Sequence, residues 1–334
     1  MQPTIDNVRS IVEKSGSIRQ AERDLRSLGV QTSERSLRRL LAKVGDDGYD
    51  VEPLPPSIDV EELIAARSAR FDTKKKHTEA AKVRTVYLRN NQTIGVGFQG
   101  DGHLDDDGTD LREFFQHAAL FDGSRKGLYL GFMGDLFNNW VGRLTALFDK
   151  QAITGAETQA LIKHYAENHR FLFYVLGNHD MWNGKEDILQ YTFRATCNIV
   201  TAHEQRVKLV FPNGREVLIH ARHKFPGNSM YATQFGQMKY ATLDGQADIY
   251  VGGDKHVSGY SNGVHAGTHK MWSALQVASY KKYDEYPVEL GLPAKDLYNC
   301  PVAIIDPKAS DINLIRWEFD PFEGAERLKW EQSR

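Results

Sequence analysis

The chain has 334 residues, 41% of them hydrophobic, and its 42 Lys and Arg against 44 Asp and Glu give a formal charge of −2. This composition excludes disorder along the whole chain, and the near-zero charge excludes a molecule-wide attraction to polyanions or membrane surfaces. Two cysteines, Cys197 and Cys300, are too few for a disulfide scaffold or a cysteine-cage zinc site, and no apolar run approaches the roughly 20 residues that span a bilayer.

The first 44 residues form a basic segment. Nine Lys or Arg and five Asp or Glu give it a charge of +4, so the other 290 residues carry −6. Helices are expected at about 5–14, at 18–28 between an N-cap at Ser17 and a terminating Gly29, and from about Ser33 onward. The third helix has a basic outer face, made of Arg35, Arg38, Arg39 and Lys43. This pattern is typical of a helix-turn-helix and predicts DNA binding; a helical dimerisation or docking bundle is the alternative.

A linker separates the basic segment from the rest of the chain. Its prolines cannot continue a helix, but residues 59–70 are expected to form one, because apolar residues recur there at helical spacing. The basic run that follows is expected to be a solvated face. The sequence therefore divides into a helix-turn-helix over 1–45, a linker with a helix over 46–85, and a main domain over 86–334.

The main domain alternates short apolar strands with glycine-containing loops and helices. The clearest helix is expected over 148–168, and Pro212-Asn213-Gly214 is expected to connect two strands as a hairpin. The expected strands are 94–98, 128–133, 171–176, 207–211, 217–222, 249–251, 273–277 and 302–305. This pattern predicts an α/β chain with mixed sheets.

Side chains suited to metal binding follow five successive strands of this domain. Residues i and i+2 of an extended segment point the same way, so Asp101 and His103 can share a metal, as can Asp254 and His256. Asp135 follows the second strand, after a glycine. The remaining candidates follow the third and fourth strands and are Asn178, His179, Asp180, His220 and His223. A single such histidine is more often structural, but five strand ends in this order indicate a metal site.

The order Asp-x-His, Gly-Asp, Gly-Asn-His-Asp, His and Gly-x-x-His resembles the signature of the calcineurin-like metallophosphoesterases, over roughly 90–310. A narrower resemblance to phage and prophage members is carried by 100–108, 138–144, 222–227 and 279–284. Such members often have an N-terminal helix-turn-helix. The resemblance implies a two-layer mixed β-sheet core flanked by helices, with two divalent metals at the strand ends. Mn²⁺ is expected first, with Fe, Zn²⁺, Ni²⁺ or Mg²⁺ as alternatives.

The resemblance also implies ligand roles. Of the two fourth-strand histidines, His223 is favoured over His220 because the loop begins directly after it. The family has a histidine where this chain has Asp254, which either ligates as a carboxylate or leaves the second metal site weakened or lost. Asp135 is expected to bridge the metals. The implied ligands are Asp101, His103, Asp135, Asn178, His223, Asp254 and His256.

The expected chemistry is hydrolysis of a phosphoric ester by metal-bound hydroxide. By resemblance His179 protonates the leaving oxygen and Asp180 orients its imidazole, while Asn138 and Arg143 are candidates for phosphate contact; a surface salt bridge is the alternative for Arg143. Four aspartates are too many for one such centre, and most of them are expected to be solvated or to support the site: Asp105, Asp106, Asp107 and Asp110. The chain lacks the Gly-x-x-x-x-Gly-Lys-Ser/Thr and Gly-x-Ser-x-Gly motifs of other hydrolases.

The expected function is therefore a metal-dependent phosphodiesterase or nuclease acting on nucleic acid. The alternatives are a DNA-binding phage accessory or regulatory protein with a degenerate site, and a phosphomonoesterase acting on protein or nucleotide. DNA is the expected partner. The first residues lack the pattern of a signal peptide, so the cytoplasm of a bacterial host or a phage-infected cell is the expected location.

Overall fold

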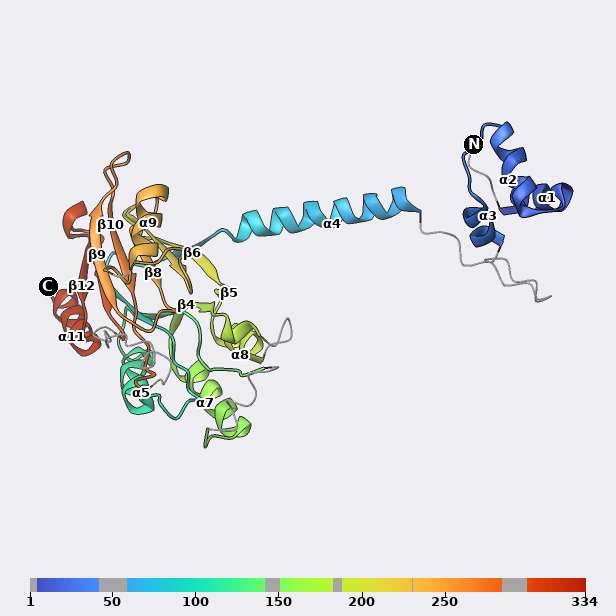
Figure 1. The fold of residues 1–334 in the computed structure, drawn as a ribbon. Coiled ribbons are helices and arrows are strands. Elements are labelled where there is room, and N and C mark those ends of the chain that lie inside the picture. Colours follow the sequence, from blue (N-terminus) through green and yellow to red (C-terminus); the bar gives the residue numbers. More distant parts are fainter. Residues whose placement is uncertain (1–4, 42–58, 142–150, 183–187, 230, 284–298) are drawn as a thin grey trace. The chain divides into compact units, whose positions relative to one another are not determined.

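The structure is a computed structural model. It describes residues 5–41, 59–141, 151–182, 188–229, 231–283 and 299–334. The candidates Lys43 and Arg143 lie outside these residues. The chain divides into two compact units, Met1–Asp72 and Thr73–Arg334 (Figure 1).

The first unit contains three short helices around a small core. They are α1 (Ile5–Ser15), α2 (Ile18–Ser27) and α3 (Glu34–Leu41). The prediction of Ser17 as the N-cap of α2 is confirmed, since its side chain accepts a hydrogen bond from the Gln20 N–H at 3.2 Å. The core is formed by Ala21, Leu25 and Leu37.

The outer face of α3 is basic, as the sequence predicts. Arg35, Arg38 and Arg39 are all exposed. Arg38 pairs with Glu34 one turn earlier, at 2.6 Å. Leu37 on the opposite face is fully buried, so packing fixes which side of α3 is free.

Helix α4 (Val60–Ala81) has 22 residues and is longer than the predicted 59–70. The prediction ended too early because the residues after Arg70 contain neither glycine nor proline, and nothing in them stops a helix. The side chains of Lys74–His77 are exposed, as expected for a solvated face. Among the described residues, none of the helices combines the length and apolarity needed to cross a membrane.

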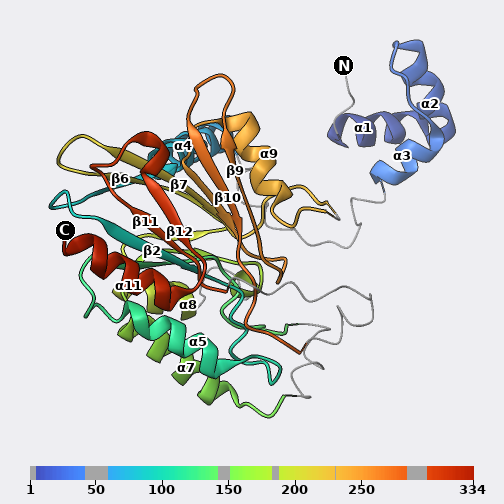
Figure 2. The ribbon, with the colours of Figure 1, turned by 90° about the vertical axis from the view of Figure 1, so that its left-hand side faces the viewer.

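The second unit is built on two six-stranded mixed sheets (Figures 1 and 2). The first has the order β12-β11-β2-β3-β4-β5, and its strands β2 to β5 are parallel. The second has the order β1-β6-β7-β8-β10-β9, in which β7, β8 and β10 are parallel. The strands are β1 (Val83–Tyr87), β2 (Ile94–Gln99), β3 (Leu128–Phe132), β4 (Phe171–Leu176), β5 (Val200–Ala202), β6 (Glu204–Val210), β7 (Glu216–Arg222), β8 (Ile249–Gly252), β9 (Gly259–Val264), β10 (Met271–Gln276), β11 (Val302–Ile305) and β12 (Ile315–Glu318).

Two apolar layers hold the sheets in place. Side chains such as Val96, Phe173 and Val251 fill the space between the sheets. The other face of the first sheet is covered by helices, and α9 packs on β8 and β10 of the second (Figures 1 and 2). The prediction of a two-layer mixed sheet core flanked by helices is confirmed. The helices are α5 (Leu111–Ala118), α7 (Gly155–Asn168), α8 (Ile188–Thr196), α9 (Phe235–Asp244) and α11 (Pro321–Gln332), with 3-10 turns η1 (Ala119–Phe121), η3 (His179–Met181) and η5 (Asp311–Asn313).

The predicted helix over 148–168 is wrong at its start. Residues 148–150 lie outside the described residues, and α7 begins only at Gly155. Thr154 and Glu157 form a capping box, in which each side chain accepts a hydrogen bond from the other residue's backbone N–H. This reciprocal cap fixes the first turn of α7, and residues 151–154 precede it.

Candidate metal centre

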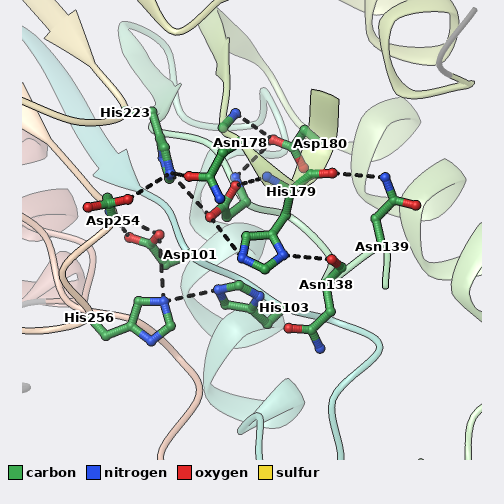
Figure 3. A network of polar contacts seen from close by, with 12 residues as sticks. Asp101, His103, Asn138, Asn139, Asn178, His179, Asp180, His223, Asp254 and His256 are labelled. Carbon is green, nitrogen blue, oxygen red and sulfur yellow. Dashed lines mark hydrogen bonds and ion pairs between the residues drawn. The ribbon is translucent and has the colours of Figure 1, made fainter. Parts of the chain in front are cut away.

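The predicted ligand positions lie where parallel strands of both sheets end. Strands β2, β3 and β4 of the first sheet and β7 and β8 of the second bring their carboxyl ends to one edge (Figure 3). Glycines allow the segments to approach closely. A Cβ added at Gly177 would collide with the Asp135 carboxylate, and one added at Gly253 would lie 2.6 Å from Asp101 Oδ2.

The backbone at this edge is held in an uncommon conformation. Among the described residues eight non-glycine residues have positive φ, and five of them are predicted ligands. Such conformations cost free energy, and they persist where surrounding contacts over-determine them. The five are Asp101 (φ 47°), His103 (φ 41°), Asp135 (φ 55°), Asp254 (φ 73°) and His256 (φ 57°).

A first group of donors comes from the ends of β2 and β8. Asp101, His103 and His256 offer ligand atoms that all lie within 4.8 Å of one another. The Nε2 atoms of His103 and His256 are 3.1 Å apart, and Asp101 Oδ1 is 4.0 Å from His256 Nε2. Asp101 and His103 are almost wholly buried, so their donor atoms are shielded from bulk water.

A second group shares Asp101 with the first and adds Asp135 and His223. His223 Nε2 lies 3.2 Å from Asp135 Oδ2 and 3.1 Å from the side-chain oxygen of Asn178. The other ring nitrogen of His223 donates to the Met133 carbonyl at 2.7 Å, which holds Nε2 toward the centre. The shared residue of the two groups is thus Asp101, and bridging by Asp135 stays a prediction.

The structure separates the two fourth-strand histidines. His220 points to the other face of β7, where its ring contacts Phe225 and Tyr250 and its Nε2 lies 3.4 Å from Glu204. His223 is the histidine that lies at the centre. A side-chain period of two along a strand explains why residues three apart face opposite sides.

Asp254 faces the centre and is also paired with a lysine. Its backbone N–H donates to the Asp101 carboxylate at 3.0 Å, and its Oδ1 is 3.8 Å from His223 Nε2. Lys224 Nζ lies 2.8 Å from Asp254 Oδ2. The negative charge that Asp254 adds, relative to a histidine, is therefore offset by a neighbouring cation that sequence reasoning missed. Its position in the sequence, directly after the ligand candidate His223, is the feature that could have indicated a cation at the centre.

The predicted role of Asp180 in orienting His179 is wrong. Asp180 is fully buried and accepts hydrogen bonds from three backbone N–H groups, those of Asp135 (2.8 Å), Leu136 (3.0 Å) and Gly177 (2.9 Å). These donors meet at its carboxylate because β3 and β4 are neighbours and both turn sharply after their last residue. Asp180 thus joins the loop after β3, which carries Asp135, to the loop after β4, which carries Asn178.

His179 is oriented by a backbone carbonyl instead. Its Nδ1 donates to the Asn138 carbonyl at 2.6 Å, which leaves Nε2 facing the centre, 3.9 Å from Asp135 Oδ2 (Figure 3). Asn139 Nδ2 donates to the His179 carbonyl at 2.9 Å. The loop after β3 therefore fixes both the ring and the backbone of His179.

Asp105 and Asp106 organise this same loop. Asp105 accepts from the Asn138 backbone N–H at 2.6 Å, and Asp106 accepts from the Asn138 side chain at 3.0 Å. Asp106 also pairs with Lys281 at 2.9 Å, where both side chains are largely buried. Asp107 is exposed and accepts from Ala152. Asp105 and Asp106 thus support the loop after β3 from outside the donor groups, whereas the described contacts of Asp107 are with Gln151 and Ala152.

The electrostatics of the centre favour a bound cation. Burial raises the pKa of Asp101, and burial followed by the neighbouring His256 lowers the pKa of His103. Burial opposes charge on Asp135 and His223 as well, but each stabilises the other's charge. The pKa of Asp135 is therefore lowered and that of His223 raised. A divalent cation can replace the positive charge of the His223 proton, so carboxylate, amide and imidazole donors here fit a metal of the Mn²⁺, Fe, Zn²⁺ or Ni²⁺ type.

Comparisons with known proteins give only distant matches. No family model matches the chain, and no curated protein does. Similar solved structures include Vps29 of Entamoeba histolytica complexed with Zn²⁺ (TM-score 0.32, 12% identity, covering 67% of this chain and 97% of that one) and a predicted phosphoesterase of Streptococcus pneumoniae (0.31, 12%, 68% and 98%). A 5′-nucleotidase of Candida albicans has a TM-score of 0.36 at 12% identity, covering 74% of this chain and 54% of that one. Likenesses of this size identify neither a family nor a substrate, so interpretation depends on the residues of the centre.

Proposed function

We propose that this chain is a metal-dependent phosphoesterase of the calcineurin-like type, with two divalent metals. The observation that carries the proposal is the convergence of two donor groups, which share Asp101, on one sheet edge. Beside them lies His179, which is oriented through Nδ1 and directs Nε2 toward the donors. The donors arrive in the chain order that the family signature has. Asp101, His103 and His256 would hold one metal, and Asn178 and His223 the other, with Asp254 beside it; Asp135 would be a ligand to both.

The charge of a phosphoester explains why such a centre suits it. The ester is an anion and repels an attacking hydroxide. Divalent metals, when bound, would neutralise charge on the phosphoryl oxygens and lower the pKa of a water molecule. Two lysines add to this field, since Lys224 lies 2.8 Å from Asp254 and Lys281 lies 2.9 Å from Asp106. Their charges attract an anionic substrate while the aspartates hold the ammonium groups in place.

His179 is the residue we assign to proton transfer. Attack on phosphorus forms one P–O bond and breaks another, and the leaving oxygen needs a proton unless it is a weak base. With Nδ1 donating to the Asn138 carbonyl, a proton on Nε2 is directed toward the centre and can pass to that oxygen. The proton lost by the attacking water later restores the imidazolium.

We expect His179→Ala to lower turnover according to the leaving group. General acid catalysis contributes about 10²–10⁴-fold for a basic leaving group, and nitrophenolate needs little protonation. The measurement is kcat for an alkyl phosphodiester and a nitrophenyl phosphodiester in Mn²⁺, with metal content by elemental analysis. His164→Ala serves as a control, because His164 is exposed on α7. Equal losses on the two esters would contradict the acid role, and no hydrolysis of either ester by the metal-loaded wild-type protein would contradict the proposed function.

We further propose that the substrate is nucleic acid, and that the first unit is a DNA-binding helix-turn-helix. Support comes from the exposed basic face of α3, whose buried side packs on α1 and α2. A phosphomonoesterase is the alternative, and would hydrolyse nitrophenyl phosphate faster than the diester. A degenerate site is the other alternative, and would hold fewer than two metals per chain.

Neutralising the basic face is expected to weaken duplex binding in a salt-dependent way. Arg35→Gln with Arg39→Gln removes two charges, so the slope of log K against log salt should become shallower by about 2. Fluorescence anisotropy with a labelled duplex across a salt series measures this slope. A matched two-charge control is Arg125→Gln with Lys308→Gln, exposed residues of the second unit. If the α3 variant and the control bind equally, the helix-turn-helix proposal is wrong.

A further inference from the structure

Two tryptophans flank His179 at the rim of the centre. The ring of Trp182 lies against His179, with centroids 4.1 Å apart and planes tilted by 39°. The ring of Trp140 meets His179 edge-on at 5.5 Å and lies 6.3 Å from Trp182. Both tryptophans are only partly buried. The aromatic pair therefore borders the side of the centre where the proposed acid works.

The pair stands outside the apolar cores that the described residues form. Neither tryptophan belongs to the hydrophobic clusters formed by the described residues. Each comes from a loop that also carries a candidate ligand: Trp140 lies on the loop after β3, with Asp135, and Trp182 follows the η3 turn, after Asn178. Two large aromatic rings are thus placed at the site by the same loops that place its ligands.

Polar atoms without partners lie beside the rings. Within the part of the chain that the structure describes, Trp140 Nε1 and Asn138 Oδ1 are buried and have no hydrogen-bond partner. Asn138 is 1% exposed, and buried polar atoms of this kind ordinarily have a partner in the working state. Lys281 Nζ lies 6.0 Å from the centre of the Trp140 ring. The Trp140 ring thus has a cation near it and a buried N–H group without a partner.

We propose that Trp140 and Trp182 form a stacking platform for the base of the nucleoside on the leaving side of the scissile phosphate. This inference rests on the proposed function, and names the substrate class as a phosphodiester whose leaving group carries a nucleobase. A nucleobase offers a flat π-face to the partly exposed rings, and stacking of this kind does not depend on the identity of the base. The platform lies next to His179, which protonates the leaving oxygen. The two rings therefore contact the leaving nucleoside and not the part of the substrate that keeps the phosphate.

The test compares dinucleotides in which one base is missing. Wild-type protein is given dT-dT and two analogues, each with a tetrahydrofuran residue in place of one nucleoside. We expect kcat/KM to fall about tenfold or more when the base of the leaving nucleoside is absent, and much less when the other base is absent, because stacking on an aromatic side chain contributes about that much per base.

Three variants assign the preference to the platform. Trp182→Ala and Trp140→Ala are expected to remove the preference for the base, while Trp182→Phe retains most of it. Trp330→Ala on α11 is the matched control, since Trp330 is half exposed and stacks with Arg327 and Arg334. Loss of kcat/KM by the same factor on all three substrates would mean that the rings only position His179, and would overturn the proposal. So would a wild-type protein that hydrolyses the substrates without any preference.

A binding measurement separates this proposal from the proposed function. Tryptophan emission is titrated with dT-dT at a pH and metal concentration that support binding, without regard to turnover. We expect quenching in the wild-type protein and the Trp330→Ala control, and its loss in Trp182→Ala and Trp140→Ala. Quenching without hydrolysis would reject the enzyme and retain the platform, and absence of quenching would reject the platform even if hydrolysis is observed.

Discussion

Replacing Asp135 by Asn is expected to lower phosphodiester hydrolysis by about 10³-fold and to reduce the metal content of the protein. In the wild type the His179 backbone N–H donates to Asp135 Oδ1 at 3.0 Å. The change keeps the size of the side chain and an oxygen that can accept this bond. It removes the negative charge that faces His223 Nε2 at 3.2 Å. Metal stabilisation of a developing charge is worth several kcal/mol, and each 1.36 kcal/mol is a factor of ten.

The measurement is metal stoichiometry together with kcat/KM for a nitrophenyl phosphodiester in Mn²⁺. Asp107→Asn is the control, because Asp107 is exposed and its described contacts are with the segment around Ala152. It should keep its metals and most of its activity. If Asp135→Asn also keeps both, Asp135 does not hold metal. If it loses one metal and keeps the other, Asp135 ligates without bridging.

The strands that surround the site could be predicted because they are buried on both faces. β2, β4 and β8 consist of buried residues throughout, which gives continuous apolar runs in the sequence. β1 and β12 lie at the edges of their sheets and are mostly exposed or half-buried, so neither alternation nor an apolar run marks them. They were missed for this reason.

The ligands could be predicted because spacing and strand ends determine where they lie. Asp101 and His103 lie in one donor group, as their spacing predicts, although both have positive φ and are not extended. Asp254 and His256 do not share a group: His256 lies with Asp101 and His103, whereas Asp254 Oδ1 lies 3.8 Å from His223 Nε2. Contacts between distant segments could not be predicted. The pairing of Lys224 with Asp254 joins residues 30 apart in sequence, and depends on β7 and β8 being parallel neighbours.

The role of Asp180 was mistaken for a related reason. A carboxylate next to a histidine in sequence suggests a carboxylate–imidazole pair, but consecutive residues in a tight turn need not face each other. In the η3 turn the Asp180 side chain faces inward toward backbone N–H groups while the His179 ring packs against Trp182. The sequence identifies Asp180 as a candidate, but it does not determine the direction in which the Asp180 side chain points.

Replacing Asp180 by Ala is therefore expected to affect the fold of the centre more than the proton transfer. The change leaves the N–H groups of Asp135, Leu136 and Gly177 buried without their acceptor. Each unsatisfied buried group costs about 1–3 kcal/mol, so we expect the free energy of unfolding to fall by about 3 kcal/mol or more. Urea unfolding followed by circular dichroism measures this, with an unchanged m-value if the two states keep their compactness.

Asp180→Asn distinguishes this interpretation from an orienting role toward His179. In the wild type Oδ2 accepts from Asp135 and Gly177 and Oδ1 accepts from Leu136. An amide has one oxygen, so it can serve two of these donors but presents its own N–H to the third. Asp180→Asn should therefore lie between the wild type and Asp180→Ala in stability and in metal affinity. An orienting carboxylate predicts the reverse: normal stability and metal content in both variants, with a loss confined to esters that need a protonated leaving group.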